Sequence, residues 1–163
     1  EHLLKGLKYI DAKKGRHGLA RLWCMDWNAS IRRFADGDAE SVLISQQLAY
    51  CTKLMSALAE ALGRRDVVAW CDRVFGRMDA ALNDAAWDGK WFIRCFDDAG
   101  NPIGSDANEQ AKIFLNSQSW ALIADLVTLV GFSALLGTSV ASASPPSALT
   151  NRCASASASA APG

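Results

Sequence analysis

Residues 40–63 read ESVLISQQLAYCTKLMSALAEALG, and this stretch decides the fold of the chain. Its apolar residues recur at alternating steps of four and three positions: Ile44, Leu48, Cys51, Met55, Leu58 and Leu62. This spacing places them along one side of an α-helix. We therefore predict a long amphipathic helix that begins near Asp38, a good N-cap residue, and ends at Gly63.

A second helix is predicted directly after the short link Gly-Arg-Arg at residues 63–65. Asp66 is a suitable N-cap for it. Its apolar side carries Val67, Cys71, Val74, Met78 and Leu82. Because so short a link leaves the chain no room to run back, the two helices should form an antiparallel hairpin.

Further elements are predicted on both sides of this hairpin. Upstream, a short helix has one apolar face, made of Leu3, Leu4, Leu7 and Ile10. Downstream, residues 91–96 resemble a short strand between two turns at 87–91 and 97–102, which predicts a small β-hairpin. A last helix, capped by Asn116 or Ser117, would carry Trp120, Ile123 and Val127 on one face.

The charge and cysteine content of the chain argue against several classes of protein. The 17 basic and 17 acidic residues cancel, so there is no basic surplus for nucleic acid or an anionic membrane. The five cysteines include no CxxC pair, which argues against a disulfide framework and a zinc site. We expect no metal, no nucleic-acid partner and a reduced, cytoplasmic setting. The first residues resemble the middle of a helix, so no signal peptide is expected.

The composition changes after about residue 126. Arg152 is the only charged residue from 127 to 163, and the end is rich in Ala, Ser and Pro. Such sequence cannot bury a core, so we expect residues 1–126 to form the folded domain and residues 127–163 to be disordered or read out of frame. The apolar run at 126–141 has about 16 residues, fewer than the roughly 20 that a membrane span needs.

Residues 24–34, CMDWNASIRRF, contain the candidate site. Asp26, Trp27 and Asn28 combine an acid, an aromatic ring and an amide, which are groups suited to holding a sugar ring. Each also has a structural interpretation, as a support of the loop, a core residue and a turn residue respectively. His17 is interpreted as a residue that holds its loop, because no Ser or Cys nucleophile motif accompanies it.

Three segments carry a resemblance to one known family. Residues 16–31, RHGLARLWCMDWNASI, resemble its HGLP…GDWND segment. Residues 40–63 resemble its ESVxxxxxxxYxLxxLAxLAxxLG helix, and residues 87–123 resemble its WDGEWYxRAFxDxGxxxGSxxNEE…KIxLNxQSWAxI segment. Order and spacing agree over roughly residues 1–126. The family is that of the cellobiose and cellodextrin phosphorylases, glycoside hydrolase family 94.

The resemblance implies a fold and a reaction. The fold would be part of an (α/α)6 barrel, hence all-α with a small β-hairpin. The reaction would be inverting phosphorolysis of a β-linked gluco-oligosaccharide to α-glucose 1-phosphate, with inorganic phosphate as co-substrate and no other cofactor. The substrate-binding residues would be Asp26, Trp27, Asn28 and Gln118, although Gln118 also suits a barrel-lining or core position. The family also implies a homodimer, and open apolar faces of a partial barrel predict aggregation.

One departure from the family puts catalysis in doubt. The family pattern Asp-Trp-Asn-Asp ends in the general acid, and the corresponding residue here is Ala29. A phosphorylase needs this single acid, since phosphate is already a nucleophile, and a methyl group cannot donate a proton. The family's phosphate-binding His and Thr-Gly pair, expected after QSWA, are also missing. We therefore predict a fragment that is inactive alone.

Two other interpretations remain open. In one, the chain is an ordinary member of the family seen in part, with Ala29 a single substitution or a sequence error. Alternatively, it is a non-catalytic helical module that binds an oligosaccharide or a protein partner through its Trp-rich surface.

Overall fold

The computed structural model describes residues 1–23, 26–28, 31 and 37–126. Its helices are α1 (His2–Asp11), α2 (Val42–Ala61), α3 (Arg65–Ala81) and α4 (Leu115–Ile123), with a π-helical turn, η3 (Leu82–Ala86), after α3. Its strands are β1 (Glu40–Ser41), β2 (Cys95–Phe96) and β3 (Pro102–Ile103). Helices dominate the described residues, as the periodicity predicts. The predictions for Ala29, for Val127 and for the 127–163 segment lie outside these residues.

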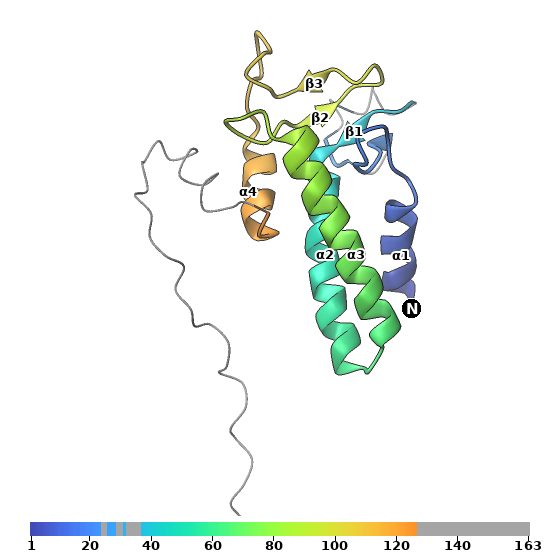
Figure 1. The fold of residues 1–163 in the computed structure, drawn as a ribbon. Helices are drawn as coiled ribbons and strands as arrows, with labels where there is room; N and C mark the ends of the chain where they lie inside the picture. The colour runs from blue at the N-terminus through green and yellow to red at the C-terminus, as the bar shows by residue number, and fades with distance from the viewer. Residues whose placement is uncertain (24–25, 29–30, 32–36, 127–163) are drawn as a thin grey trace, which may run out of the picture.

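The predicted antiparallel hairpin is formed by α2 and α3. Figure 1 shows the sheet across one end of this hairpin and the connecting turn at the other. Gly63 lies in that turn at φ +67°, a backbone conformation that favours glycine. The predicted apolar face of α3 is confirmed, because all five of its residues are buried: Val67, Cys71, Val74, Met78 and Leu82.

The predicted apolar face of α2 is buried only in its first half. Leu48 is 1% exposed, whereas Leu58 and Leu62 are 46% and 68% exposed. In the second half, the small side chain of Ala59 packs in a cluster with residues of α3. One side of α2 is covered there, and the leucines on its other side remain in solvent.

The prediction that Asp38 caps α2 is wrong. The helix begins at Val42 and its N-cap is Ser41, whose Oγ accepts a hydrogen bond from the N–H of Ile44 at 3.2 Å. Asp38 instead forms an ion pair with Arg21 at 2.6 Å. The helix starts later than predicted because the two residues before it pair with β2 in the sheet.

The sheet has three antiparallel strands in the order β1-β2-β3. Glu40 and Ser41 of β1 lie opposite Phe96 and Cys95 of β2. Strands β2 and β3 form the predicted hairpin. Strand β1 is not predicted, because two residues are too few to display an alternating pattern.

Two other predicted helix caps are also wrong. Arg64 occupies the cap position of α3, and Asp66 lies in the first turn, where the helix dipole still favours its charge. Helix α4 begins at Leu115, ahead of both predicted caps. The side chain of Asn116 instead accepts a hydrogen bond from the N–H of Ser117 at 2.9 Å.

The difference between the two halves of α2 is testable with one pair of variants. Leu48→Ala should lower the free energy of unfolding by about 2–5 kcal/mol, because it leaves a cavity in the core. Leu62→Ala, the same change at an exposed position, should alter it by no more than about 0.5 kcal/mol. Urea denaturation followed by circular dichroism measures both. Equal losses would contradict the described packing of α2.

Candidate functional site

Two consecutive residues of β1 hold two different loops. Glu40 and Ser41 are both fully buried, and adjacent side chains of a strand point to opposite faces. Glu40 contacts the loop that carries His17, and Ser41 contacts the turn that carries Asp26. The candidate site is built on these two contacts.

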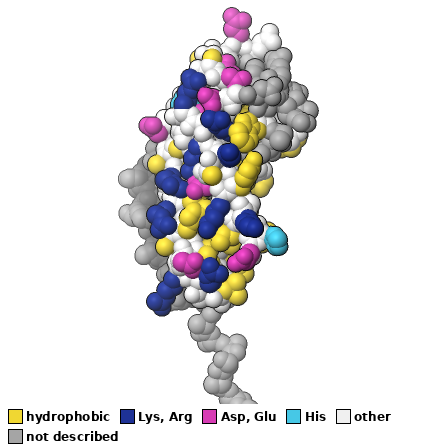
Figure 2. All heavy atoms as spheres, turned by 90° about the vertical axis from the view of Figure 1, so that its right-hand side faces the viewer, with side chains coloured by type: hydrophobic (Ala, Val, Ile, Leu, Met, Phe, Trp, Pro, Cys, Tyr) yellow, Lys and Arg dark blue, Asp and Glu magenta, His cyan; other side chains and the backbone are white. Residues whose placement is uncertain are grey.

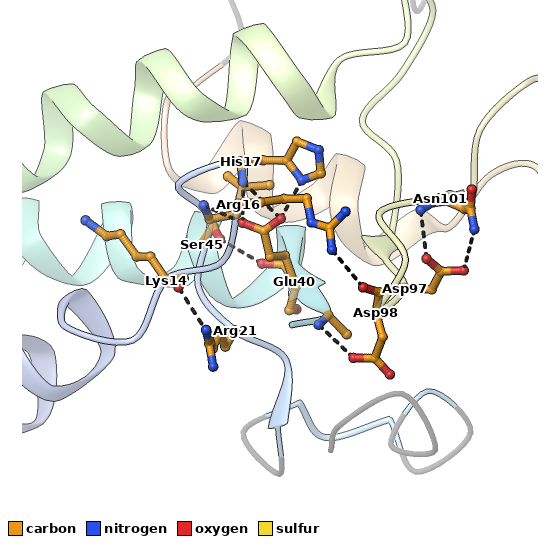
Figure 3. A network of polar contacts seen from close by, with 12 residues as sticks. Lys14, Arg16, His17, Arg21, Glu40, Ser45, Asp97, Asp98 and Asn101 are labelled. Carbon is orange, nitrogen blue, oxygen red and sulfur yellow. Dashed lines mark hydrogen bonds and ion pairs between the residues drawn. The ribbon is translucent and has the colours of Figure 1, made fainter. Parts of the chain in front are cut away.

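The Glu40 carboxylate organises the first loop (Figure 3). It accepts hydrogen bonds from the N–H of His17 at 3.1 and 3.2 Å and from the N–H of Leu19 at 3.0 Å. Nδ1 of His17 lies 2.5 Å from Oε2 of Glu40, and the imidazole stacks on Phe96 with ring centroids 4.0 Å apart. A Cβ on Gly15 would overlap the Glu40 side chain, so glycine is required there. His17 therefore holds its loop.

The same loop is tied to the turn between β2 and β3. Arg16 donates hydrogen bonds to the carbonyl oxygens of Ala99 at 2.8 Å and Asp98 at 2.9 Å. The side chain of Asp98 in turn accepts a hydrogen bond from the N–H of Ala39 at 3.0 Å, immediately before β1. Figure 3 shows this chain of contacts from the Arg16 guanidinium to the turn. The first loop, β1 and the hairpin turn thus support one another.

A buried ion pair fixes the second loop, which is the turn that carries Asp26. The side chains of Asp26 and Arg94 are both 0% exposed, and Nη2 of Arg94 lies 2.6 and 2.7 Å from the two carboxylate oxygens. Ser41 donates its hydroxyl to Oδ2 of Asp26 at 2.8 Å, and the N–H of Asn28 donates to Oδ1 at 3.0 Å. Both carboxylate oxygens are therefore occupied by donors from the protein.

The predicted sugar-site residues of this turn differ in their exposure. Trp27 is 72% exposed, so the alternative that it fills the core does not hold. Asn28 is half-buried, and Asp26 is 2% exposed. Ala29, the position of the family's general acid, lies outside the described residues. Within the described turn, the indole of Trp27 is the group presented to solvent.

The side chain of Gln118 forms its hydrogen bonds with Phe92 and Phe114. It is 8% exposed, and its Oε1 accepts a hydrogen bond from the N–H of Phe92 at 3.0 Å. Its Nε2 donates to the carbonyl oxygens of Phe92 at 2.7 Å and Phe114 at 3.1 Å. These contacts tie α4 to the segment before β2, which matches the core position that the sequence also suggested for this residue.

Three residues of the site were not predicted from the sequence: Arg94, Glu40 and Ser41. A signal for Arg94 is present in residues 92–96, FIRCF, where one charge interrupts an apolar run. Such a charge is buried only if a partner neutralises it, so the pattern predicts an ion pair but not its partner. A helix that begins near Asp38 would have Glu40 in its first turn, so the prediction of this helix start misses the role of Glu40 in the sheet.

Cys95 packs beside the second loop as an apolar residue. It forms a small buried cluster with Leu22, Ile31 and Ala39. Burial raises the pKa of its thiol to about 12. Because the thiolate is the nucleophilic form, Cys95 has no nucleophilic role at neutral pH.

In the part of the chain that the structure describes, no three or more His, Cys, Asp or Glu side chains are grouped so that they could hold a metal ion. Over the same residues, no helix has the length and apolar character needed to cross a membrane. Cys51, Cys71 and Cys95 are free thiols.

A model of one protein family, described as the glycosyl hydrolase 94 superfamily, catalytic domain, matches residues 1–132. The chain belongs to this superfamily. The catalytic domain of glycosyl hydrolase 94 proteins is an (α/α)6 barrel, to which the helices described above correspond. The family resemblance inferred from the three sequence segments is therefore confirmed.

Individual proteins are also similar to about three quarters of the chain. The 3-O-beta-D-glucopyranosyl-beta-D-glucuronide phosphorylase of Paenibacillus borealis is 33% identical over 129 residues, which are 78% of this chain and 17% of that protein. Solabiose phosphorylase of the same organism is 31% identical over 128 residues, 77% of this chain and 17% of that protein. The cyclic beta-(1,2)-glucan synthase NdvB of Rhizobium meliloti (strain 1021) is 29% identical over 124 residues, which are 76% of this chain and 4% of that protein.

These matches define how much of a relative the chain represents. The aligned part spans about 17% of the length of the two Paenibacillus phosphorylases. The match to the family model, over residues 1–132, includes the Asp26–Arg94 pair and Trp27.

The raised pKa of Cys95 predicts a pH dependence of stability. The unfolded thiol ionises near its ordinary pKa of 9.0, whereas the folded thiol keeps its proton to about 12. The contribution is therefore intact below pH 9 and is lost as the pH rises toward 12. Between pH 8 and pH 10.5, the wild type should lose about 2 kcal/mol more unfolding free energy than Cys95→Ala. Urea denaturation at both pH values measures this, and equal losses would mean that the thiol ionises in the folded protein.

Proposed function

We propose that this chain is part of the catalytic domain of an inverting glycoside phosphorylase and that its Asp26-Trp27-Asn28 turn contributes to the site for a β-linked glucoside. The observation that carries the proposal is the indole of Trp27, 72% exposed on a turn whose base is a buried ion pair. An exposed aromatic ring on a rigid base suits stacking against a sugar ring. The relatives named as phosphorylases support the reaction class.

The reaction requires one proton donor. A phosphate oxygen attacks the anomeric carbon as the glycosidic C–O bond breaks, and a general acid transfers its proton to the departing oxygen. The products are α-glucose 1-phosphate, with inverted configuration, and a shorter sugar. By resemblance the acid belongs at position 29, where this chain has Ala29. We therefore propose that the chain contributes sugar contacts but no general acid, and that it is inactive as it stands.

Restoring the acid tests this proposal. Residues 1–126 can replace the matching segment of the Paenibacillus glucuronide phosphorylase, with position 29 as Ala or as Asp. The Ala29→Asp chimera should release glucose 1-phosphate from that relative's substrate about 10²–10⁴ times faster than the Ala29 chimera, which is the usual effect of general acid catalysis. Enzymatic detection of glucose 1-phosphate measures both rates.

A matched control distinguishes the effect of an acid at position 29 from the effect of any added carboxyl group nearby. Ser30→Asp adds the same carboxyl group one residue later and should leave the rate at the Ala29 level. An Ala29 chimera as active as the parent phosphorylase, or a folded Ala29→Asp chimera without activity, would contradict the proposal.

A second candidate function is oligosaccharide binding without turnover. The combination of an exposed Trp27 with an alanine at the acid position favours it. Trp27→Ala should then weaken cellobiose binding by about tenfold or more, because stacking on the ring is lost. Isothermal titration calorimetry of the 163-residue chain measures this. Trp70→Ala, at a half-buried Trp on α3, is the control, and equal affinity of both variants would argue against a sugar site at Trp27.

The remaining parts of the proposal concern assembly and location. Leu54, Leu58 and Leu62 form an exposed apolar row on α2, which supports self-association or a homodimer. Phosphate is the proposed co-substrate, and no other cofactor is proposed. The free cysteines support a reduced, cytoplasmic setting.

A further inference from the structure

The ion pair between Asp26 and Arg94 determines what this turn offers to a ligand. Oδ1 of Asp26 accepts hydrogen bonds from Arg94 and from the N–H of Asn28. Oδ2 accepts hydrogen bonds from Arg94 and from the hydroxyl of Ser41. With its side chain 0% exposed, Asp26 has no oxygen directed to solvent. Asp26 is therefore unsuited to direct contact with a sugar hydroxyl, although the sequence placed it among the substrate-binding residues.

The hydrogen bonds of Asp26 also set the direction of the Trp27 side chain. The hydrogen bond from the N–H of Asn28 to Oδ1 of Asp26 closes a tight turn, since an Asp side chain that accepts from the residue two positions later mimics a backbone turn. Trp27 is the residue between them and stands at the outside of this turn, 72% exposed. The position of the indole thus depends on the position of the carboxylate beneath it.

A buried ion pair is a costly way to hold a turn. Apolar residues of similar volume often stabilise a core as well or better, because two charges must lose their hydration. Arg94 also has a buried Nε without a hydrogen-bond partner among the described residues. What Arg94 adds is directional geometry, since its planar guanidinium places Nη2 on the Asp26 carboxylate and Nη1 3.4 Å from the Ser41 hydroxyl at the same time.

We propose that Arg94 is a positioning residue of the sugar site: through Asp26 and Ser41, it fixes the turn so that the Trp27 ring faces the ligand. The identity of the ligand as a β-linked glucoside rests on the proposed function. The role of Arg94 rests on the contacts alone. Arg94 lies 68 positions from Asp26 in the sequence, so it also makes the turn dependent on the segment that leads into β2.

Fluorine NMR of the whole 163-residue chain labelled with 5-fluorotryptophan tests this proposal. The chain has six tryptophans, and the Trp27 signal is assigned as the one that Trp27→Phe removes. The decisive variant combines Asp26→Asn with Arg94→Met, which removes both charges but keeps an oxygen at residue 26 to accept the hydrogen bond from the N–H of Asn28. Cellobiose is the titrated sugar.

We expect the wild type and the double variant both to unfold cooperatively in urea, while the Trp27 signal of the double variant shifts and its cellobiose affinity falls by about tenfold or more. A role in stability alone would leave both the signal and the affinity unchanged once the fold is retained. The matched control is Arg64→Met, which removes an exposed two-hydrogen-bond pair with Asp66 at the opposite end of the helical hairpin. It should leave the Trp27 signal and the affinity unchanged.

Arg94→Lys provides a second variant if the double variant fails to fold. It keeps the charge but has one nitrogen in place of the two by which Arg94 contacts Asp26 and Ser41, so the Trp27 signal should shift in the folded protein. A Trp27 signal unchanged in every folded variant overturns the proposal. A wild-type Trp27 signal that does not respond to cellobiose instead contradicts the proposed function, while the shift between variants still decides whether Arg94 positions the ring.

Discussion

The described part of the molecule depends on the burial of Glu40 and Ser41 in consecutive positions of one short strand. Their side chains leave β1 on opposite sides, and each ends in a loop that has little regular structure of its own. Because Ser41 also caps α2, the position of both loops is coupled to the start of the longest helix. The loops are thus fixed by polar contacts to a rigid element, which is how a binding surface acquires a defined shape without a large core beneath it.

The helices could be predicted from the sequence because their signal is local. The four buried positions of α3 and Leu82 at the start of η3 follow directly from the spacing of apolar residues. Periodicity does not reveal which neighbours cover a helix, and this is why Leu58 and Leu62 were assigned to a buried face although α2 is covered on one side only at that end. The start of α2 was misplaced for a related reason: pairing with a strand more than fifty residues away takes Glu40 and Ser41 out of the helix.

The candidate site, like the fold, could be predicted from the sequence only in part. The segment around Trp27 was identifiable because its residue types match a family motif, and the family is confirmed. The sequence did not reveal which residues of the motif face a ligand and which support the turn. Whether Asp26 faces a ligand or a guanidinium depends on Arg94, which is remote in the sequence. A lone charge inside FIRCF indicates that a partner exists, but only the fold brings that partner into contact.

The separation of these contacts along the chain has a consequence for the order of folding. The hairpin of α2 and α3 joins neighbouring segments, whereas Asp26 and Arg94 are 68 positions apart and Arg16 and Ala99 are 83 apart. Closing long loops costs chain entropy before any contact repays it, so these separations predict that the hairpin forms first and the sheet end forms later. During synthesis on the ribosome, the turn at Trp27 leaves the exit tunnel long before Arg94 and acquires its fixed shape only once that residue has emerged.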